Sequence, residues 1–255
     1  MIPTTSAIEI CNAEIRGCEV KLVVIANAAG GVGKTSIALA CSVAATEYGK
    51  KTLLIDADPK AGVTFSCGVE NPRVTIKEFL SDEFSLDASI VKTSERFSLL
   101  PASSRLANLE FEKLLASGKA KDKLQDFDLV VVDTQSAFSG LTNYFTALAD
   151  LLLIPSTSDI LSIRGAVHTK EFAAQSGYEG IPLLIFNKSS AEVDVEIKHQ
   201  SQGDFEILEP AIRFDALVPQ SQITGKSFLT TANQSEVAAD IRDITYSVLE
   251  KVGLI

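Results

Sequence analysis

At 255 residues, with 46% hydrophobic and 22% charged residues, the chain is long enough to bury a sizeable core in one α/β domain. It contains no apolar run near the roughly 18 to 20 residues that span a bilayer, which excludes a membrane-spanning class. A formal net charge of −10 argues against a protein whose whole surface coats DNA, although a local basic patch is compatible with it.

The first twenty residues lack the basic start, apolar centre and small-residue cleavage site of a secretory signal. We therefore expect residues 1–20 to form an N-terminal extension and residues 21–255 to form a single domain. The four cysteines include no Cys-x-x-Cys pair, which fits a protein of the reducing cytoplasm.

From residue 21 onward, apolar runs rich in β-branched residues alternate with stretches of helical period. This alternation is typical of a doubly wound, mostly parallel sheet with helices on both faces. Strands are expected at residues 21–27, 51–56, 97–102, 128–133, 150–155 and 182–187, with a further short one near 211–218. Helices are expected at 35–47, 104–116, 140–148 and 163–175, with a last one that Ser235 can cap, and the polar stretch 189–205 is expected to be a surface excursion.

The stretch GGVGKTS, residues 30–36, follows an expected strand and opens an expected helix, which is the context of a phosphate-binding loop. The glycines let backbone N–H groups turn inward on phosphate oxygens. Lys34 neutralises the β and γ phosphates, and the Thr35 hydroxyl is a Mg²⁺ ligand. The loop residues expected to bind nucleotide are Gly30, Gly31, Val32, Gly33, Lys34, Thr35 and Ser36.

Three carboxylates follow at the ends of two other expected strands. Asp56 and Asp58 lie in LLIDADPKAG, where they can hold the Mg²⁺ water shell and orient the attacking water. Asp133 ends DLVVVD and fits a Walker B aspartate that acts on Mg²⁺ through water. The expected metal ligands are therefore Thr35, Asp56 and Asp133.

These motifs, in this order, resemble those of the ParA/MinD family of deviant-Walker P-loop ATPases. Its members typically read KGGVGKT, then DxDPQ, then a Walker B strand ending in Asp, and here the counterparts are AGGVGKT, DADPK and VVVDTQS. Weaker echoes follow in LLPAS, ADLLLIPSTSD, FNK and AIRFDALVPQSQITGKS, so the resemblance covers most of the chain from about Lys21. It implies a P-loop NTPase fold that binds ATP and Mg²⁺, with hydrolysis dependent on Asp58, Asn187 at the adenine and Pro219 closing the base pocket.

The chain departs from the family pattern at Ala29, where members usually carry a signature lysine. That lysine crosses the ATP-bound dimer to the partner's phosphates, so its loss predicts either weak turnover or a substitute cation. The McdA branch, which positions carboxysomes, also lacks it and still hydrolyses ATP. The expected substitutes, in order, are Lys170, Arg164 and Lys60, which makes Lys170 a candidate catalytic residue beside Asp58 and Lys34.

The resemblance implies a cytoplasmic, nucleoid-associated ATPase that forms a homodimer on ATP and binds DNA without sequence preference. A ParB-like or McdB-like adaptor would stimulate hydrolysis, and the cargo would be a plasmid, a chromosome or a protein compartment such as a carboxysome. Candidate DNA contacts are Arg213, Lys226 and Arg242.

Two alternatives remain open. One is a MinD-like membrane-associated ATPase, which would need a basic amphipathic C-terminal segment. The C-terminal stretch SVLEKVGLI has one lysine and one glutamate and lacks a basic face. A metabolic enzyme similar to dethiobiotin synthetase shares the fold and the GKT loop, but the DADPK stretch and the order of the later motifs argue against it.

Overall fold

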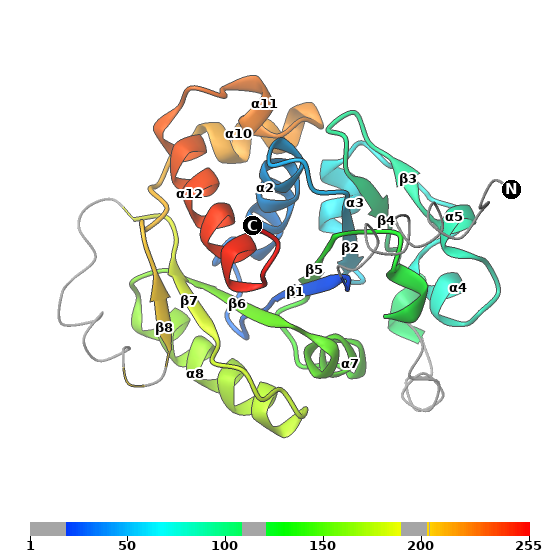
Figure 1. Cartoon of the computed structure of the whole chain (residues 1–255), viewed down its shortest axis with the longest axis horizontal. Coiled ribbons are helices and arrows are strands. Elements are labelled where there is room, and N and C mark those ends of the chain that lie inside the picture. The colour runs from blue at the N-terminus through cyan, green and yellow to red at the C-terminus, as the bar shows by residue number, and fades with distance from the viewer. Residues whose placement is uncertain (1–18, 109–120, 190–202, 204) are drawn as a thin grey trace, which may run out of the picture.

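A mostly parallel β-sheet runs through the middle of the molecule (Figure 1). The computed structural model describes residues 19–108, 121–189, 203 and 205–255. In these residues the sheet has eight strands in the order β3-β4-β2-β5-β1-β6-β7-β8, and β3 with β4 is the antiparallel pair among otherwise parallel neighbours.

The strands are β1 (Lys21–Ile25), β2 (Thr52–Ala57), β3 (Val91–Lys92), β4 (Ser98–Leu100), β5 (Leu129–Thr134), β6 (Leu151–Ser156), β7 (Leu183–Phe186) and β8 (Glu206–Leu208). The α-helices are α2 (Lys34–Glu47), α3 (Gly62–Ser66), α4 (Ile76–Leu80), α5 (Leu86–Ser89), α7 (Gly140–Leu148), α8 (Ile160–Gln175), α10 (Leu217–Thr224), α11 (Phe228–Thr231) and α12 (Glu236–Lys251). Among the described residues, no helix is long and apolar enough to cross a membrane.

Helices cover both faces of the sheet, as the alternation of apolar runs predicts. In β1, Leu22 and Val24 join one apolar core while Val23 and Ile25 join the other, because successive side chains of a strand point to opposite faces. The first core includes side chains of α4, α7 and α8, and the second includes side chains of α2, α11 and α12. Helices α7 and α8 lie on one side of the sheet, and α2 and α12 lie on the other (Figure 1). The expected doubly wound α/β fold is confirmed.

One strand prediction is wrong. Residues 211–216 form no strand, and 217–224 form α10, whereas the last strand is the short β8 at Glu206–Leu208. The segment near Ile212 does continue past the end of β7, since the Ile212 N–H donates to the Phe186 carbonyl at 2.8 Å and a single bridge pairs Ser189 with Arg213. Its apolar residues therefore lie beside the sheet without joining its ladder.

Several boundaries differ from those expected. Helix α8 begins at Ile160, three residues early, because the Asp159 carboxylate accepts the N–H groups of Leu161 and Ser162. Ser235 is the N-cap residue of α12, but its hydroxyl makes no cap hydrogen bond. Of the expected helix 104–116, Ser104–Asn108 is a 3-10 helix and 109–120 lies outside the described residues. Most of the extension 1–20 and of the polar stretch 189–205 also lies outside them.

The carboxyl ends of the central strands bring the motifs to one edge of the sheet. Asp133 on β5 lies in register with Ile25 on β1 and with Asp56 on β2. The loops that follow β1, β2, β5 and β7 therefore surround a common space, where ligands bind in open α/β sheets.

Candidate functional site

The loop between β1 and α2 has the backbone of a phosphate-binding loop. Gly31 and Gly33 have φ values of 75° and 97°, in the left-handed region that favours glycine. A Cβ at Gly33 would also lie 2.2 Å from Nδ2 of Asn187, so a side chain there would displace the Asn187 amide. Gly33 thus combines a conformation and a close approach that only glycine satisfies.

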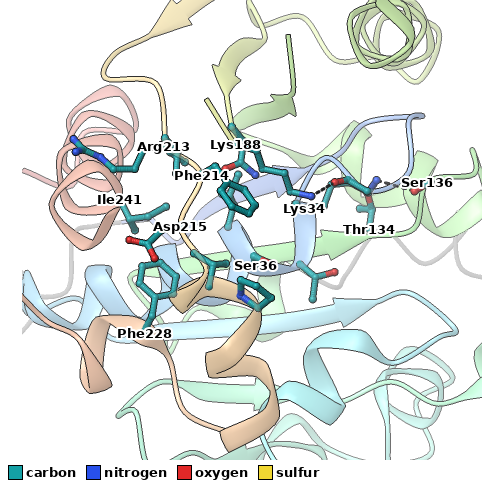
Figure 2. Close-up of a pocket in the computed structure, with 18 of the residues that line it drawn as sticks. Lys34, Ser36, Thr134, Ser136, Lys188, Arg213, Phe214, Asp215, Phe228 and Ile241 are labelled. Atoms are coloured by element: carbon teal, nitrogen blue, oxygen red, sulfur yellow. Dashed lines mark hydrogen bonds between the residues drawn. The ribbon is translucent and has the colours of Figure 1, made fainter. Parts of the chain in front are cut away.

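The Lys34 side chain folds back over this loop and is only 7% exposed. Its ammonium donates to the carbonyls of Asn27 and Ala29, both at 2.9 Å. It also donates to the Ser136 hydroxyl at 2.8 Å (Figure 2). Burial lowers the pKa of Lys34, while the charges of Asp133 and Asp58 oppose that shift. The ammonium is therefore held at the mouth of the loop by neutral oxygens, which an anionic phosphate can replace.

Thr35 and Asp133 meet at the start of α2. The Thr35 hydroxyl donates to Oδ2 of Asp133 at 2.8 Å, whereas Oδ1 of Asp133 is buried and has no hydrogen-bond partner among the described residues. Burial raises the pKa of Asp133 well above its usual value, and the nearby Asp56 carboxylate adds to the rise. An unpartnered buried carboxylate oxygen beside a hydroxyl fits a Mg²⁺ ion and its bound water, which Mg²⁺ retains readily.

Asp56 has a different environment from the one its motif predicts. Its Oδ2 accepts the backbone N–H and the hydroxyl of Thr64 at 2.8 and 2.7 Å, and its Oδ1 accepts the Asp58 N–H at 3.1 Å. Burial raises the pKa of Asp56 to about 6, and the Thr64 hydrogen bonds oppose the rise. These contacts hold the loop that carries Asp58. They do not support direct metal ligation by Asp56, which stays a prediction.

A cavity of about 360 Å³ extends from the phosphate loop toward α10 and α12. Asp58, Asn187 and Pro219 line it. Their roles, at hydrolysis for Asp58 and at the base for Asn187 and Pro219, stay predictions. The loop residues in its lining are Gly31, Gly33, Lys34, Thr35 and Ser36. Val32 contributes its carbonyl, which accepts from Nδ2 of Asn187 at 2.7 Å.

Comparison with known proteins decides the family. The model of a family described as an AAA domain, AAA_31, matches residues 20–176, which is more than half of the chain. The chain belongs to the ParA/MinD family of P-loop ATPases.

One relative of this ATPase matches nearly the whole chain. The maintenance of carboxysome distribution protein A of Synechococcus elongatus is 27% identical over 250 residues, which are 91% of this chain and 98% of that protein. Two solved structures share the fold. The ATP complex of Cyanothece McdA(D38A) has a TM-score of 0.76 at 22% identity, covering 94% of this chain and 98% of that one. The Mg-ADP complex of the septum site-determining protein MinD from Pyrococcus horikoshii has a TM-score of 0.77 at 19% identity, covering 92% and 98%.

The three candidate substitutes for the missing lysine do not line the nucleotide cavity of this ATPase. The Lys170 ammonium lies over the Phe205 ring, 5.7 Å from its centroid. Arg164 is exposed on α8, and Lys60 lines a second cavity beside α3. A role for Lys170 or Arg164 across a dimer stays a prediction, since one chain does not test it.

Two of the three candidate DNA contacts are held by carboxylates of the same chain. Arg213 donates to both oxygens of Asp240, at 2.7 and 3.0 Å, and also pairs with Glu236. Arg242 pairs with Glu47 at 2.6 Å. Lys226 is exposed. These intramolecular ion pairs make Arg213 and Arg242 weaker candidates for DNA contacts, because each arginine would have to break an ion pair before it could bind a DNA phosphate.

Sequence reasoning missed several residues of the cavity lining, among them Ser136, Lys188 and Phe214. Phe214 is 62% exposed, which is unusual for a phenylalanine and suits a purine ring. Lys188 directly follows Asn187 in FNK, and Asn187 was expected to contact the adenine. The sequence therefore gave one signal for Lys188, its place beside a predicted nucleotide-binding residue. Ser136 gave no motif of its own.

Proposed function

We propose that this chain is a positioning ATPase of the McdA and ParA type. It binds ATP with Mg²⁺, dimerises on ATP and binds nucleoid DNA without sequence preference, and an adaptor protein of the ParB or McdB kind stimulates hydrolysis and release. The near full-length similarity to the carboxysome distribution protein supports this proposal most, together with a phosphate loop, Asp58 and Asp133 gathered at one edge of the sheet. The cargo is a plasmid, a chromosome or a protein compartment such as a carboxysome.

The phosphate loop and Lys34 bind the triphosphate in this proposal. Backbone N–H groups of the loop and the N-terminus of α2 face the phosphates, and Lys34 exchanges one of its neutral acceptors for a phosphate oxygen. Thr35 and Asp133 would hold Mg²⁺, since the Oδ1 atom of Asp133 lacks a partner. Mg²⁺ supplies charge neutralisation at the β and γ phosphates when it is bound.

Asp58 orients the attacking water in the same proposal. Its side chain lines the cavity, and its Oδ1 accepts the Lys60 N–H at 2.8 Å, which holds the carboxylate in place. Asp56 acts behind it by anchoring the Asp58 N–H. The two carboxylates therefore have different roles: Asp58 lines the cavity, and Asp56 holds the backbone of the loop that carries Asp58.

Asn187, Pro219 and Phe214 form the base end of the cavity. The Asn187 amide has a second N–H besides the one that it donates to Val32, so it can also bind an adenine nitrogen. Pro219 and the exposed Phe214 ring add apolar surface for a purine.

The contacts of α12 disfavour a MinD-like membrane anchor. The apolar stripe that an anchor would lay on a lipid surface is already buried against α2 and the sheet. Its members are Val237, Ile241, Ile244, Val248 and Leu249.

Retention on random-sequence DNA, measured across a salt series with and without ATP, tests the positioning function. We expect retention with ATP that falls steeply with salt, because neutralised phosphates release counterions. Lys34→Ala, which cannot hold the triphosphate, should be retained no better with ATP than without. Retention that ignores both ATP and salt would contradict the proposal. Turnover that needs a small metabolite, and neither DNA nor a protein partner, would favour the metabolic alternative.

A further inference from the structure

Two consecutive residues after β7 bond to two consecutive carbonyls of the phosphate loop. The Asn187 amide donates to the Val32 carbonyl, and the Lys188 ammonium donates to the Gly31 carbonyl, both at 2.7 Å. Lys188 has a φ of 57°, in the left-handed region that residues with a side chain rarely adopt. Such a backbone conformation persists where the surroundings hold it, and it often marks a functional site.

Lys188 is also a cation of the nucleotide cavity. Among the described residues, the cavity lining includes three cationic side chains: Lys34, Lys188 and Arg213. Arg213 is neutralised by Asp240 and Glu236, whereas no described carboxylate lies within ion-pair distance of the Lys188 ammonium. Figure 2 draws Lys188 and Lys34 in the lining of the same cavity, at the side where the phosphate loop lies.

The contact with Gly31 leaves the Lys188 ammonium able to bind a second partner. A lysine ammonium carries three N–H donors, and the Gly31 carbonyl uses one of them. The carbonyl is neutral, so it does not cancel the positive charge. A nucleotide in the cavity carries a polyanionic phosphate chain and ribose hydroxyls, which are the acceptors that a cation at this place attracts.

We propose that Lys188 is a nucleotide-binding residue of this ATPase, whose ammonium bridges the Gly31 carbonyl and an oxygen of the bound nucleotide. It supplies from the end of β7, within the same chain, a positive charge that Ala29 does not supply. This inference rests on the proposed ATP site. The candidate substitutes for the missing lysine that the sequence indicates are Lys170 and Arg164 on α8 and Lys60 after β2. None of these three lines the cavity, whereas Lys188 does.

Equilibrium binding of a fluorescent ATP analogue and of ADP to the full chain tests the proposal with Lys188→Met, which keeps an unbranched side chain one atom shorter than lysine and removes its charge. We expect affinity to fall about ten-fold or more, as for the loss of a charge-assisted hydrogen bond. Lys188→Arg should recover most of the loss, because it restores the cation. The melting temperature of the ligand-free protein should stay unchanged in both variants, which a purely structural role would not allow.

Lys92→Met is the matched control. Lys92 is exposed on β3, at the other edge of the sheet, and it too donates to a neutral oxygen, the Ser98 hydroxyl at 3.0 Å. Its affinity for nucleotide should equal that of the wild type. Repeating the titrations in high salt identifies the acceptor: a loss that shrinks with salt assigns the contact to phosphate, and one that persists assigns it to ribose.

Two results would overturn the inference. The first is that Lys188→Met binds nucleotide as tightly as the wild type. The second is that the ligand-free variant loses as much free energy of unfolding as it loses free energy of binding, which would show that Lys188 only holds the loop in place. Both differ from a failure of the ATP site itself, in which the wild type binds no nucleotide.

Discussion

At the scale of single residues, the site is organised by buried charges that lack full compensation. Lys34 rests on neutral oxygens, and Asp133 keeps one oxygen without a partner. Such groups cost stability in the folded protein unless a ligand completes their contacts. Their persistence is therefore best explained by the ligands that they bind.

Asp133→Asn tests this trade between stability and function. The substitution removes a buried negative charge without changing the shape, so the free energy of unfolding of the ligand-free protein should stay the same or rise by about 1 kcal/mol. The tightening of ATP binding by Mg²⁺ over EDTA should fall about ten-fold, and hydrolysis should fall with it. Denaturant unfolding and ATP titrations measure both. Asp126→Asn, at an exposed position, is the control. A variant that loses stability while keeping its Mg²⁺ response would show that Asp133 is structural.

At the scale of elements, α8 is packed against the start of the phosphate loop. The Ala28 N–H donates to the Thr169 hydroxyl at 2.9 Å, and the Asn27 amide donates to the Ser162 carbonyl at 3.3 Å. The contact is tight at Gly165, where a Cβ would lie 2.5 Å from Oδ1 of Asn27 and 2.8 Å from the Ala29 N and Cβ atoms. The small residues at positions 29 and 165 allow this contact, and a change at either should reach the nucleotide.

Gly165→Ala should therefore destabilise the protein, although the same change inside a helix normally stabilises it by about 1 kcal/mol. Overpacking against the loop should cost about 1–3 kcal/mol in the free energy of unfolding and weaken ATP binding. Chemical denaturation and ATP titration check both effects. His168→Ala, at an exposed position of the same helix, should stay within about 0.5 kcal/mol of the wild type. A more stable Gly165→Ala variant with normal affinity would refute the tight contact.

The start of α8 should contribute a measurable acid sensitivity. Hydrogen bonds from Ser162 and Thr157 lower the pKa of Asp159 to about 2, below its ordinary value of about 3.9. A depressed carboxyl pKa stabilises the fold above the unfolded value, and that contribution disappears as the pH falls toward 2. Asp159→Asn keeps an N-cap acceptor but cannot titrate, so it should lose less stability than the wild type between pH 4 and 2, by at most about 1 kcal/mol. Identical unfolding profiles over this range would contradict the role of Asp159.

Elements with strong local signals could be predicted from sequence, whereas contacts made by the folded chain could not. The β1–loop–α2 unit follows from an apolar run, glycines with special backbone angles and a helical period, all within residues 21–47. Strand β8 escaped prediction because it has three residues at a sheet edge and begins with Glu206. The contact of Asp56 with Thr64 joins residues eight positions apart that share no motif, so the sequence does not indicate it. The contact of Lys188 with Gly31 spans 157 positions, so the only sequence signal for Lys188 is its place beside Asn187.

At the scale of the whole molecule, one edge of the sheet gathers loops that are far apart in the chain into a single cavity. The site lies at the carboxyl ends of the strands, and Asp58 and residues of the phosphate loop line it. An ATP-dependent dimer would place two such edges face to face. In that arrangement ATP binding converts the monomer into a dimer, and ATP hydrolysis returns the dimer to monomers. This switch is the central feature of the proposed function.

The mass of the protein in solution, measured by light scattering with ATP and with ADP, tests that switch most directly. The 27.3 kDa chain should double its mass with ATP and return to a monomer with ADP. Asp58→Ala should remain a dimer with ATP for longer, because hydrolysis is slowed, and Lys34→Ala should stay monomeric. A mass that remains at 27.3 kDa for both the wild type and Asp58→Ala, under conditions where each has bound ATP, would contradict the switch.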